Sequence, residues 1–392
     1  MKSPGRGPED VHPHDRQDKV APPRRKRKKL WLLLSPLIAV VLVGLGTVVV
    51  ALVKSPGKLA PLKDSEGRVL AGSISEKVWL DVNGIQQGMF LRGESADNPV
   101  VLYLHGGPGT PMLQFITALE KEERLEKYFT VAYWDQRGAG MTYSRSSDPA
   151  TMTVDQMVDD THKVTQYLKS RFGQSKIYLL GHSWGSYLGV KVIEKYPDDY
   201  LAYVGVGQVA DATESERLTY YKMLDHAREI GDQEVVEKLE GYDPGAEGFP
   251  SLDYFVKVRS EILEKYGWGR IRRGASFSDI LGGVLNFEGY TLPEKVSWFL
   301  GADFSMVHLL PVVLADDLRV SSMKFDIPFY VLQGAYDGQC SVVLAREYLD
   351  GLDAPKKGFF LFEESAHSPN MEEPEKFVEV FRTIASENPP SP

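Results

Sequence analysis

The serine best placed for chemistry is Ser183, in the segment Gly-His-Ser-Trp-Gly at 181–185. An apolar run at 177–180 precedes this segment and a helical pattern follows it, so we expect the serine at a sharp turn from strand to helix. The flanking glycines allow close backbone packing at such a turn. The turn also holds the hydroxyl beside the positive end of the helix dipole, where an oxyanion is favoured. Ser183 is therefore predicted to be a nucleophile, provided that the chain supplies a base, an acid and an oxyanion site.

A nucleophilic serine needs a general base, which is commonly a histidine oriented by a carboxylate. Three histidines follow the serine in the sequence, at His226, His308 and His367. His226 lies in a helical pattern and His308 in an apolar stretch, which favours packing roles for both. His367 comes soon after an apolar run at 358–362. Since catalytic groups gather at the carboxyl ends of parallel strands, His367 is predicted to be the base.

The carboxylate that orients the base is predicted by the same argument. Asp337 follows an apolar run at 327–333, so it is expected at the same edge of the sheet as His367. Asp326 precedes that run and would lie at the opposite edge. A single aspartate after a strand is usually a cap or a surface charge, and it is the position relative to the serine and the histidine that identifies Asp337 as the acid.

A glycine-rich loop, His-Gly-Gly-Pro-Gly at 105–109, follows the apolar run at 100–104. Glycines let backbone N–H groups point into a site, but Pro108 has no N–H to donate. We therefore predict an oxyanion hole formed by the N–H groups of Gly107 and Trp184. A tight turn that merely requires glycine is the alternative for any one of these positions.

A second polar, glycine-rich segment lies at 135–140, after the apolar run that ends at Trp134. Here a structural role is favoured over a catalytic one. Arg137 together with Asp135 is predicted to tie neighbouring loops and so to hold the oxyanion loop in place.

The elements that must position these residues alternate between strands and helices. Short continuous apolar runs are typical of strands that are covered on both faces of a parallel sheet. They lie at 100–104, 129–134, 177–180, 203–206, 327–333 and 358–362. Helices are predicted at 153–173, where a capping box of Thr153 and Gln156 begins the helix and Gly173 ends it, from Ser183 to Tyr196, and at 374–386. This alternation predicts an α/β fold with a mostly parallel sheet and flanking helices.

Two regions depart from that alternation. Alternating runs at 77–82 and 85–91, joined by Asn-Gly, predict an antiparallel hairpin. Residues 211–323 are mostly helical and rich in aromatic side chains, and we interpret them as a helical cap inserted between a first core part at 71–210 and a second at 324–392. The cap is either a subdomain with its own core, a lid over the active site, or both, since ligand sites favour domain junctions.

The amino-terminal residues are predicted to anchor the chain in a membrane. Residues 1–29 contain ten Lys and Arg against four Asp and Glu, and they read as a disordered basic tail. Residues 30–53 carry no charge and are long enough, as a helix, to cross a bilayer core of roughly 30 Å. The denser cations on the amino-terminal side predict a cytoplasmic tail and an extracytoplasmic body, joined by a linker at 54–70. A cleaved signal peptide is the alternative.

The composition excludes some partners. The chain after residue 29 carries 35 Lys and Arg against 50 Asp and Glu, and an acidic body disfavours nucleic acid. Cys340 is the only cysteine, so neither an internal disulfide nor a multi-cysteine metal site is possible. We expect no metal and no organic cofactor, and the expected partners are a small-molecule or short-peptide substrate and, through 30–53, the membrane.

Taken together, these motifs resemble those of the proline iminopeptidase-like branch of the α/β hydrolases. The resemblance covers about 74–385 and rests on the loop at 105–109, Asp-Gln-Arg-Gly at 135–138, the serine segment at 181–186, and the late aspartate and histidine. It implies an α/β-hydrolase fold with a Ser–Asp–His triad. Members of this branch remove amino-terminal residues, typically proline, from peptides, and related sequences hydrolyse other amides or esters.

This chain departs from the pattern of that branch at several positions. His182 stands where glycine is usual, Ala139 and Met141 replace cysteine and arginine, and Cys340 stands where valine or proline is frequent. The peptidases bind the substrate amine with carboxylates of the cap. The resemblance offers two candidates for that role, Glu214 and Glu216.

The predicted function is that of a membrane-anchored serine hydrolase that cleaves an amide or ester through an acyl-enzyme, in the manner of a proline iminopeptidase. A carboxylesterase or lipase without peptidase activity is the first alternative. A non-catalytic surface binding protein that kept the fold is the second. A serine at the turn argues against dehalogenase and epoxide hydrolase chemistry, which uses an aspartate there in this fold.

Overall fold

The computed structural model describes residues 50–120, 123–274 and 276–390. The predicted basic tail at 1–29 and nearly all of the predicted membrane segment at 30–53 lie outside these residues. Within them, one helix, α9 (Leu292–Leu314), is long and apolar enough to cross a bilayer by length and composition alone. Its side chains Trp298 and Leu309 are buried against the body, whereas Val296 and Val307 are exposed. The membrane anchor at 30–53 therefore stays a prediction.

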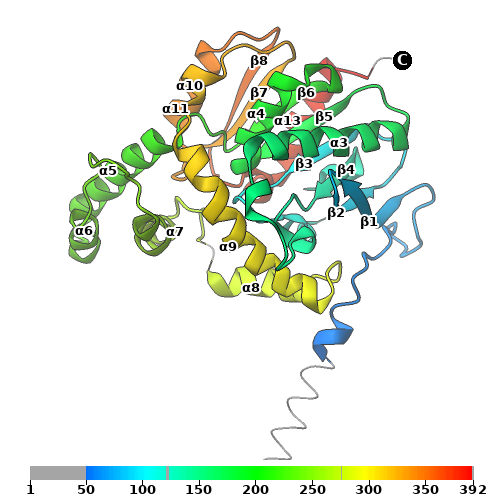
Figure 1. Ribbon diagram of the computed structural model, residues 1–392, viewed down its shortest axis with the longest axis horizontal. Coiled ribbons are helices and arrows are strands. Elements are labelled where there is room, and N and C mark those ends of the chain that lie inside the picture. The colour runs from blue at the N-terminus through cyan, green and yellow to red at the C-terminus, as the bar shows by residue number, and fades with distance from the viewer. Residues whose placement is uncertain (1–49, 121–122, 275, 391–392) are drawn as a thin grey trace, which may run out of the picture. The chain divides into compact units, whose positions relative to one another are not determined.

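The core of the fold is one eight-stranded sheet with the order β1-β2-β4-β3-β5-β6-β7-β8 (Figure 1). Its strands are β1 (Ile74–Val82), β2 (Ile85–Gly93), β3 (Val100–Leu104), β4 (Thr130–Trp134), β5 (Ile177–His182), β6 (Tyr200–Val206), β7 (Phe329–Gly334) and β8 (Lys357–Phe362). β1 and β2 pair antiparallel, as do β2 and β4, and every pair from β4 to β8 is parallel. The predicted hairpin and the predicted parallel strands are all present.

Helices pack on both faces of this sheet, and others form the insertion between β6 and β7. They are α2 (Leu113–Ile116), α3 (Val154–Phe172), α4 (Trp184–Lys195), α5 (Ala212–Ile230), α6 (Gln233–Glu240), α7 (Ser260–Tyr266), α8 (Phe277–Asn286), α9, α10 (Leu318–Ser321), α11 (Val342–Gly351), α12 (Pro369–Glu372) and α13 (Pro374–Glu387). Short 3-10 turns lie at Leu125–Lys127, Gly140–Thr142, Pro149–Thr151 and Pro197–Asp199, and a π-helical turn, η6, spans Tyr254–Arg259. The helices α3, α4 and α11 bury their apolar side chains in one core cluster, while α2 and α13 contribute to a second cluster. The inner parallel strands therefore have both faces covered, whereas the edge strand β8 is partly exposed.

The ends of α3 show how the sequence sets a helix boundary. The Thr153 side chain accepts the Gln156 N–H at 3.2 Å, and Gly173 adopts a left-handed φ of 65° at the other end. The Gln156 side chain, however, donates to Asp160 and does not return to the backbone of Thr153. The predicted cap is present, but the reciprocal half of the predicted capping box was wrong, because a buried carboxylate competes for the glutamine amide.

The residues between β6 and β7 form two groups of helices. The first, α5 to α7, has a small core of its own, which includes Tyr220, Met223, Leu263 and Trp268. The second, α8 and α9, packs into the two clusters of the sheet domain through side chains such as Val284 and Trp298. Figure 1 shows α5, α6 and α7 standing away from the sheet, and α9 lying alongside the sheet domain.

The start of the segment predicted as a linker is bound to the body. The backbone carbonyl of Lys54 accepts from Lys295 Nζ at 2.9 Å, and the Lys58 N–H donates to the carbonyl of Glu288 at 3.1 Å. Between them, Pro56 forms a β-bridge with Thr291. Residues 54–58 are thus fastened to the junction of α8 and α9, because their backbone groups find partners there.

Candidate active site

The turn at Ser183 has the strained backbone expected of an exposed nucleophile. Its φ of 55° and ψ of −121° lie in a region that non-glycine residues rarely occupy. A Cβ atom at Gly181 would lie 2.2 Å from the carbonyl oxygen of Gly185, and one at Gly185 would lie 2.0 Å from that of Leu104. Both neighbours must therefore be glycine for the turn to close against β3.

The His367 imidazole and the Asp337 carboxylate form a buried pair. His367 Nδ1 lies 2.9 Å from Asp337 Oδ2. The same carboxylate accepts the backbone N–H groups of Gln339 and Cys340 at 2.8 and 2.9 Å, and it also accepts Gln333 Nε2 at 2.8 Å. With Nδ1 donating to the carboxylate, Nε2 carries the lone pair that a general base requires.

The second ring nitrogen of His367 takes no part in this pair. His367 Nε2 is buried and has no hydrogen-bond partner among the residues that the structure describes. The hydroxyl of Ser183 forms no hydrogen bond to it, and in the absence of substrate such contacts are often long and tighten on binding. The structure thus joins the predicted acid and base directly, whereas the serine is brought to the same edge without that last contact.

His182 links the serine turn to the base. Its Nε2 donates to the backbone carbonyl of His367 at 2.9 Å, and the two rings lie 4.8 Å apart between centroids. Burial, reinforced by the charge of His367, lowers the pKa of His182 to about 3. His182 therefore stays neutral and holds the loop that carries the base.

Gln136 forms hydrogen bonds that hold the glycine-rich loop at 105–109, which contains the predicted oxyanion donor Gly107. The Gln136 N–H donates to His105 Nε2 and its side-chain amide donates to the His105 carbonyl, each at 3.3 Å. Its amide oxygen accepts Trp184 Nε1 at 2.9 Å. Burial lowers the pKa of His105 to about 4, so its ring is neutral and can accept. One glutamine therefore connects the loop that contains Gly107 to the first residue of α4.

Asp135 and Arg137 were predicted to act together, but each binds other residues. Arg137 forms a two-pronged ion pair with Asp160 of α3, at 2.7 and 3.1 Å. Asp135 accepts the Met141 N–H at 2.8 Å and the hydroxyl of Tyr290 at 2.7 Å. Burial raises the pKa of Asp135 to about 7. The two side chains point into different cores, because the turn after β4 separates them.

A pocket beside the serine joins the core to the helical insertion. It is lined by Gly107, Ser183 and Trp184 and, from the insertion, by Glu216, Phe255 and Arg259. Both of the residues predicted as oxyanion donors therefore border the same space as the nucleophile. An oxygen that becomes charged in this space would have two backbone N–H groups and the start of a helix beside it.

The structure separates the two predicted cap carboxylates. Glu216 lines this pocket and is buried, but each of its oxygens lies 2.6 Å from a guanidinium nitrogen of Arg259. Glu214 lies on the half-exposed side of α5 and contacts Arg217 at 3.4 Å. Of the two, Glu216 alone borders the nucleophile.

Other predicted assignments concern residues away from the pocket. His226 packs between Tyr266 and Trp268, with ring centroids 4.8 and 5.0 Å away, and His308 bonds to the carbonyl of Phe304. The described residues contain no group of three or more His, Cys, Asp or Glu side chains arranged to hold a metal ion.

Two residues that shape the site were missed. Arg259 neutralises Glu216, and Gln136 connects the oxyanion loop to Trp184. Arg259 falls four residues after Phe255 and four before Leu263, on one face of the helical pattern, and this position was a signal for the first residue, since a buried arginine needs a partner. Gln136 was missed because the whole segment at 135–140 had been assigned a structural role.

Comparison with known proteins agrees with this geometry. The family described as the alpha/beta hydrolase fold matches residues 99–374. A Bacillus subtilis (strain 168) protein named probable aminopeptidase YbaC is 33% identical over 312 residues, which are 78% of this chain and 95% of the relative. A proline iminopeptidase of Heyndrickxia coagulans is 24% identical over 313 residues, which are 77% of this chain and 96% of that protein.

Solved structures show the same fold at lower identity. The proline iminopeptidase-related protein TTHA1809 from Thermus thermophilus aligns with a TM-score of 0.55 and 20% identity, over 80% of this chain and 98% of that one. The proline iminopeptidase of Mycobacterium smegmatis aligns with a TM-score of 0.55 and 16% identity, over 80% and 98% of the two chains. At these identities the likeness concerns the fold.

Proposed function

The chain belongs to the α/β-hydrolase fold family, and from that premise we propose that it is a serine aminopeptidase of the proline iminopeptidase type. The observation that carries this proposal is the conjunction at one sheet edge of the strained Ser183, the paired Asp337 and His367, and a pocket bordered by two backbone donors. The names of the relatives supply the reaction type, which is release of an amino-terminal residue.

The first half of the proposed reaction forms an acyl-enzyme. His367 Nε2 takes the hydroxyl proton of Ser183 while Oγ attacks the carbonyl carbon of the scissile amide. Asp337 holds the ring and stabilises the imidazolium that forms. The N–H groups of Gly107 and Trp184 receive the oxyanion, and the imidazolium then protonates the departing amine.

The second half releases the acyl group. Water takes the place of the departed amine, His367 removes its proton, and the hydroxide attacks the ester of Ser183. Collapse of the second tetrahedral intermediate returns the proton from His367 to Ser183 Oγ and frees the amino acid.

Glu216 is proposed to bind the ammonium group of the substrate. A carboxylate offers about four lone-pair directions, and Arg259 uses one on each oxygen. The remaining directions are open to an amine in the pocket that Glu216 lines. Burial raises the pKa of Glu216, and the charge and hydrogen bonds of Arg259 oppose that rise and so favour the ionised carboxylate.

We further propose that residues 30–53 anchor the enzyme, with the tail cytoplasmic and the catalytic body extracytoplasmic. The support is the charge-free run in the sequence and the denser cations before it. Protease added to intact cells would digest the body if this topology holds. A body that resists the protease until the cells are broken would contradict it.

Parallel assays test the reaction. The full-length protein in detergent would be given a proline arylamide and a short acyl ester. Release of the arylamine supports the aminopeptidase, whereas turnover of the ester alone would establish the carboxylesterase alternative. The serine hydrolase chemistry itself is common to both outcomes.

A further inference from the structure

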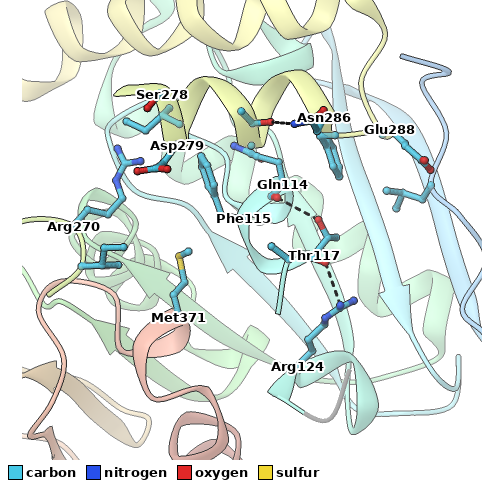
Figure 2. A pocket seen from close by; sticks show the side chains of 18 of the residues that line it. Gln114, Phe115, Thr117, Arg124, Arg270, Ser278, Asp279, Asn286, Glu288 and Met371 are labelled. Carbon is cyan, nitrogen blue, oxygen red and sulfur yellow. Dashed lines mark hydrogen bonds between the residues drawn. The ribbon is translucent and has the colours of Figure 1, made fainter. Parts of the chain in front are cut away.

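A large cleft is separate from the pocket that holds Glu216, since the two share no lining residue. Its volume is about 730 Å³. It is walled by α2, by α8 and the turn after it, by the segment that follows α7, and by Leu59 and Ala60 of the amino-terminal segment. Figure 2 shows Arg270, Phe115 and Met371 at one end of this cleft, with Asn286 and Glu288 toward the other.

Arginines dominate the charge of this cleft. Its lining contains Arg92, Arg124, Arg270 and Arg273, against the carboxylates of Asp279 and Glu288. Arg92 lies 3.6 Å from Glu126, and Arg124 donates to backbone carbonyls. The cleft therefore has a surplus of positive charge where a ligand would sit, and an anion is the ligand that such a wall favours.

Among these arginines, Arg270 is the one most expected to bind an anion. Its guanidinium forms no ion pair and no hydrogen bond with any of the residues described, although it is half-buried and lies 5.8 Å from the Phe115 ring. Burial lowers the pKa of Arg270, and the charge of Glu264 only partly opposes that effect. A guanidinium withdrawn from water without an acceptor is costly, and a bound carboxylate would offset that cost.

Asp279 forms no ion pair with the Arg270 guanidinium. Figure 2 shows Arg270 reaching toward it. Asp279 Oδ2, however, already accepts the Ser276 N–H at 2.9 Å and the Ser276 hydroxyl at 2.7 Å, as part of the cap of α8. Asp279 Oδ2 is therefore engaged in the helix cap, and Arg270 has no ion pair with any carboxylate of the described residues, which leaves its guanidinium available to a ligand.

The arginine end of the cleft adjoins the catalytic base. The carbonyl of Gly269, the residue before Arg270, accepts the backbone N–H of His367 at 3.3 Å. Met371, at the same end, lies four residues beyond His367. The charge of Arg270 also contributes to the lowered pKa of His182, after burial and the charge of His367. The segment that carries Arg270 is therefore bonded to the backbone of the residue that serves as the base.

The pocket that contains Ser183 and the arginine cleft differ in charge. The pocket with Ser183 contains Glu216 balanced by Arg259, and the cleft contains Arg270 without a paired carboxylate. In an aminopeptidase the residue to be released occupies one side of the nucleophile and the remaining peptide the other. If the residue to be released occupies the pocket beside Glu216, the arginine cleft is the space left for the remaining peptide.

We propose that this cleft binds the leaving part of a short peptide and that Arg270 binds its terminal carboxylate. The inference rests on the proposed aminopeptidase function and names the substrate class, which is peptides of two or three residues with a free carboxyl terminus. Longer peptides and proteins place no carboxylate at Arg270, so they lose this interaction.

The test compares matched substrates on the full-length protein in detergent. A proline-containing dipeptide and tripeptide are each assayed with a free carboxylate and as the terminal amide, and the ratio of kcat/KM, acid over amide, is measured. A charge-assisted hydrogen bond predicts a ratio of about ten for whichever of the two peptides, dipeptide or tripeptide, places its carboxylate at Arg270. Arg270→Gln should bring the ratio close to one, and Arg270→Lys should leave it between the two.

Arg228→Gln is the matched control, because Arg228 is exposed on α5 and pairs with Glu240 away from the cleft. It should leave the ratio unchanged. A wild-type ratio near one, or a ratio that Arg270→Gln does not lower, overturns the inference. A proline arylamide assayed alongside separates failure of the carboxylate site from failure of the aminopeptidase function. If the arylamide is cleaved while the ratio is near one, only the carboxylate site is wrong. If neither the arylamide nor any peptide is cleaved, the proposed aminopeptidase function fails and the inference falls with it.

Discussion

The ion pair in the wall of the catalytic pocket gives a sharp prediction about stability and pH. Glu216 and Arg259 are both almost fully buried, at 3% exposure each, and two contacts of 2.6 Å join them. Arg259→Met keeps most of the side-chain volume but removes the cation. A buried carboxylate left without its partner typically costs about 3–5 kcal/mol of folding free energy.

The sign of the pH dependence follows from the carboxylate. Burial raises the pKa of Glu216, and the charge and hydrogen bonds of Arg259 oppose that rise. Without Arg259 the pKa in the folded state rises further above the unfolded value of about 4.3. Below the unfolded value the carboxyl is protonated in both states and costs little. As the pH rises, the unfolded state ionises first, so Arg259→Met should lose stability progressively toward neutral pH.

Thermal unfolding of the full-length protein in detergent, followed between pH 5 and pH 8, measures this effect. At about 2 °C per kcal/mol for a chain of this size, the variant should melt about 5 °C or more below the wild type at pH 8, and the gap should narrow toward pH 5. The double variant Arg259→Met, Glu216→Gln is the control, because it removes both charges and should recover much of the loss. The account of the buried pair would be refuted if Arg259→Met were as stable as the wild type at pH 8. It would also be refuted if the difference in melting temperature did not depend on pH.

Two further predictions concern the base. Asp337→Asn should lower kcat by about 10⁴-fold, since the amide no longer fixes the tautomer of His367; steady-state kinetics check this, and a variant within tenfold of the wild type would remove Asp337 from the triad. His182→Leu removes the hydrogen bond to the His367 carbonyl and should lower kcat about fivefold with little change in KM. His308→Gln is its control, and an effect of the same size in both variants would argue against a positioning role for His182.

The location of the three proposed triad residues at one sheet edge could be predicted because it depends on chain order. Ser183, Asp337 and His367 each follow a strand, and the rule that carboxyl ends of parallel strands share an edge brings them together without further information. The partners of buried charges could not be predicted in this way. Arg137 sits two residues from Asp135 but pairs with Asp160 on α3, and Arg259 meets Glu216 only when the insertion folds.

The insertion shows the same limit on a larger scale. Its helices and aromatic side chains were evident from the sequence, but their division into two groups was not. α5 to α7 have their own core, whereas α8 and α9 belong to the sheet domain and bind residues 54–58. These contacts depend on which helix faces which surface, and periodicity alone does not specify that.

The role of Ser183 as the nucleophile of an α/β hydrolase is the point on which the proposed chemistry depends. The most direct measurement is labelling of the full-length protein with a fluorophosphonate probe, followed by identification of the modified residue by mass spectrometry. We expect a single adduct on Ser183 that is absent from Ser183→Ala. Equal labelling of the wild type and Ser183→Ala, or an adduct on another residue, would contradict that role.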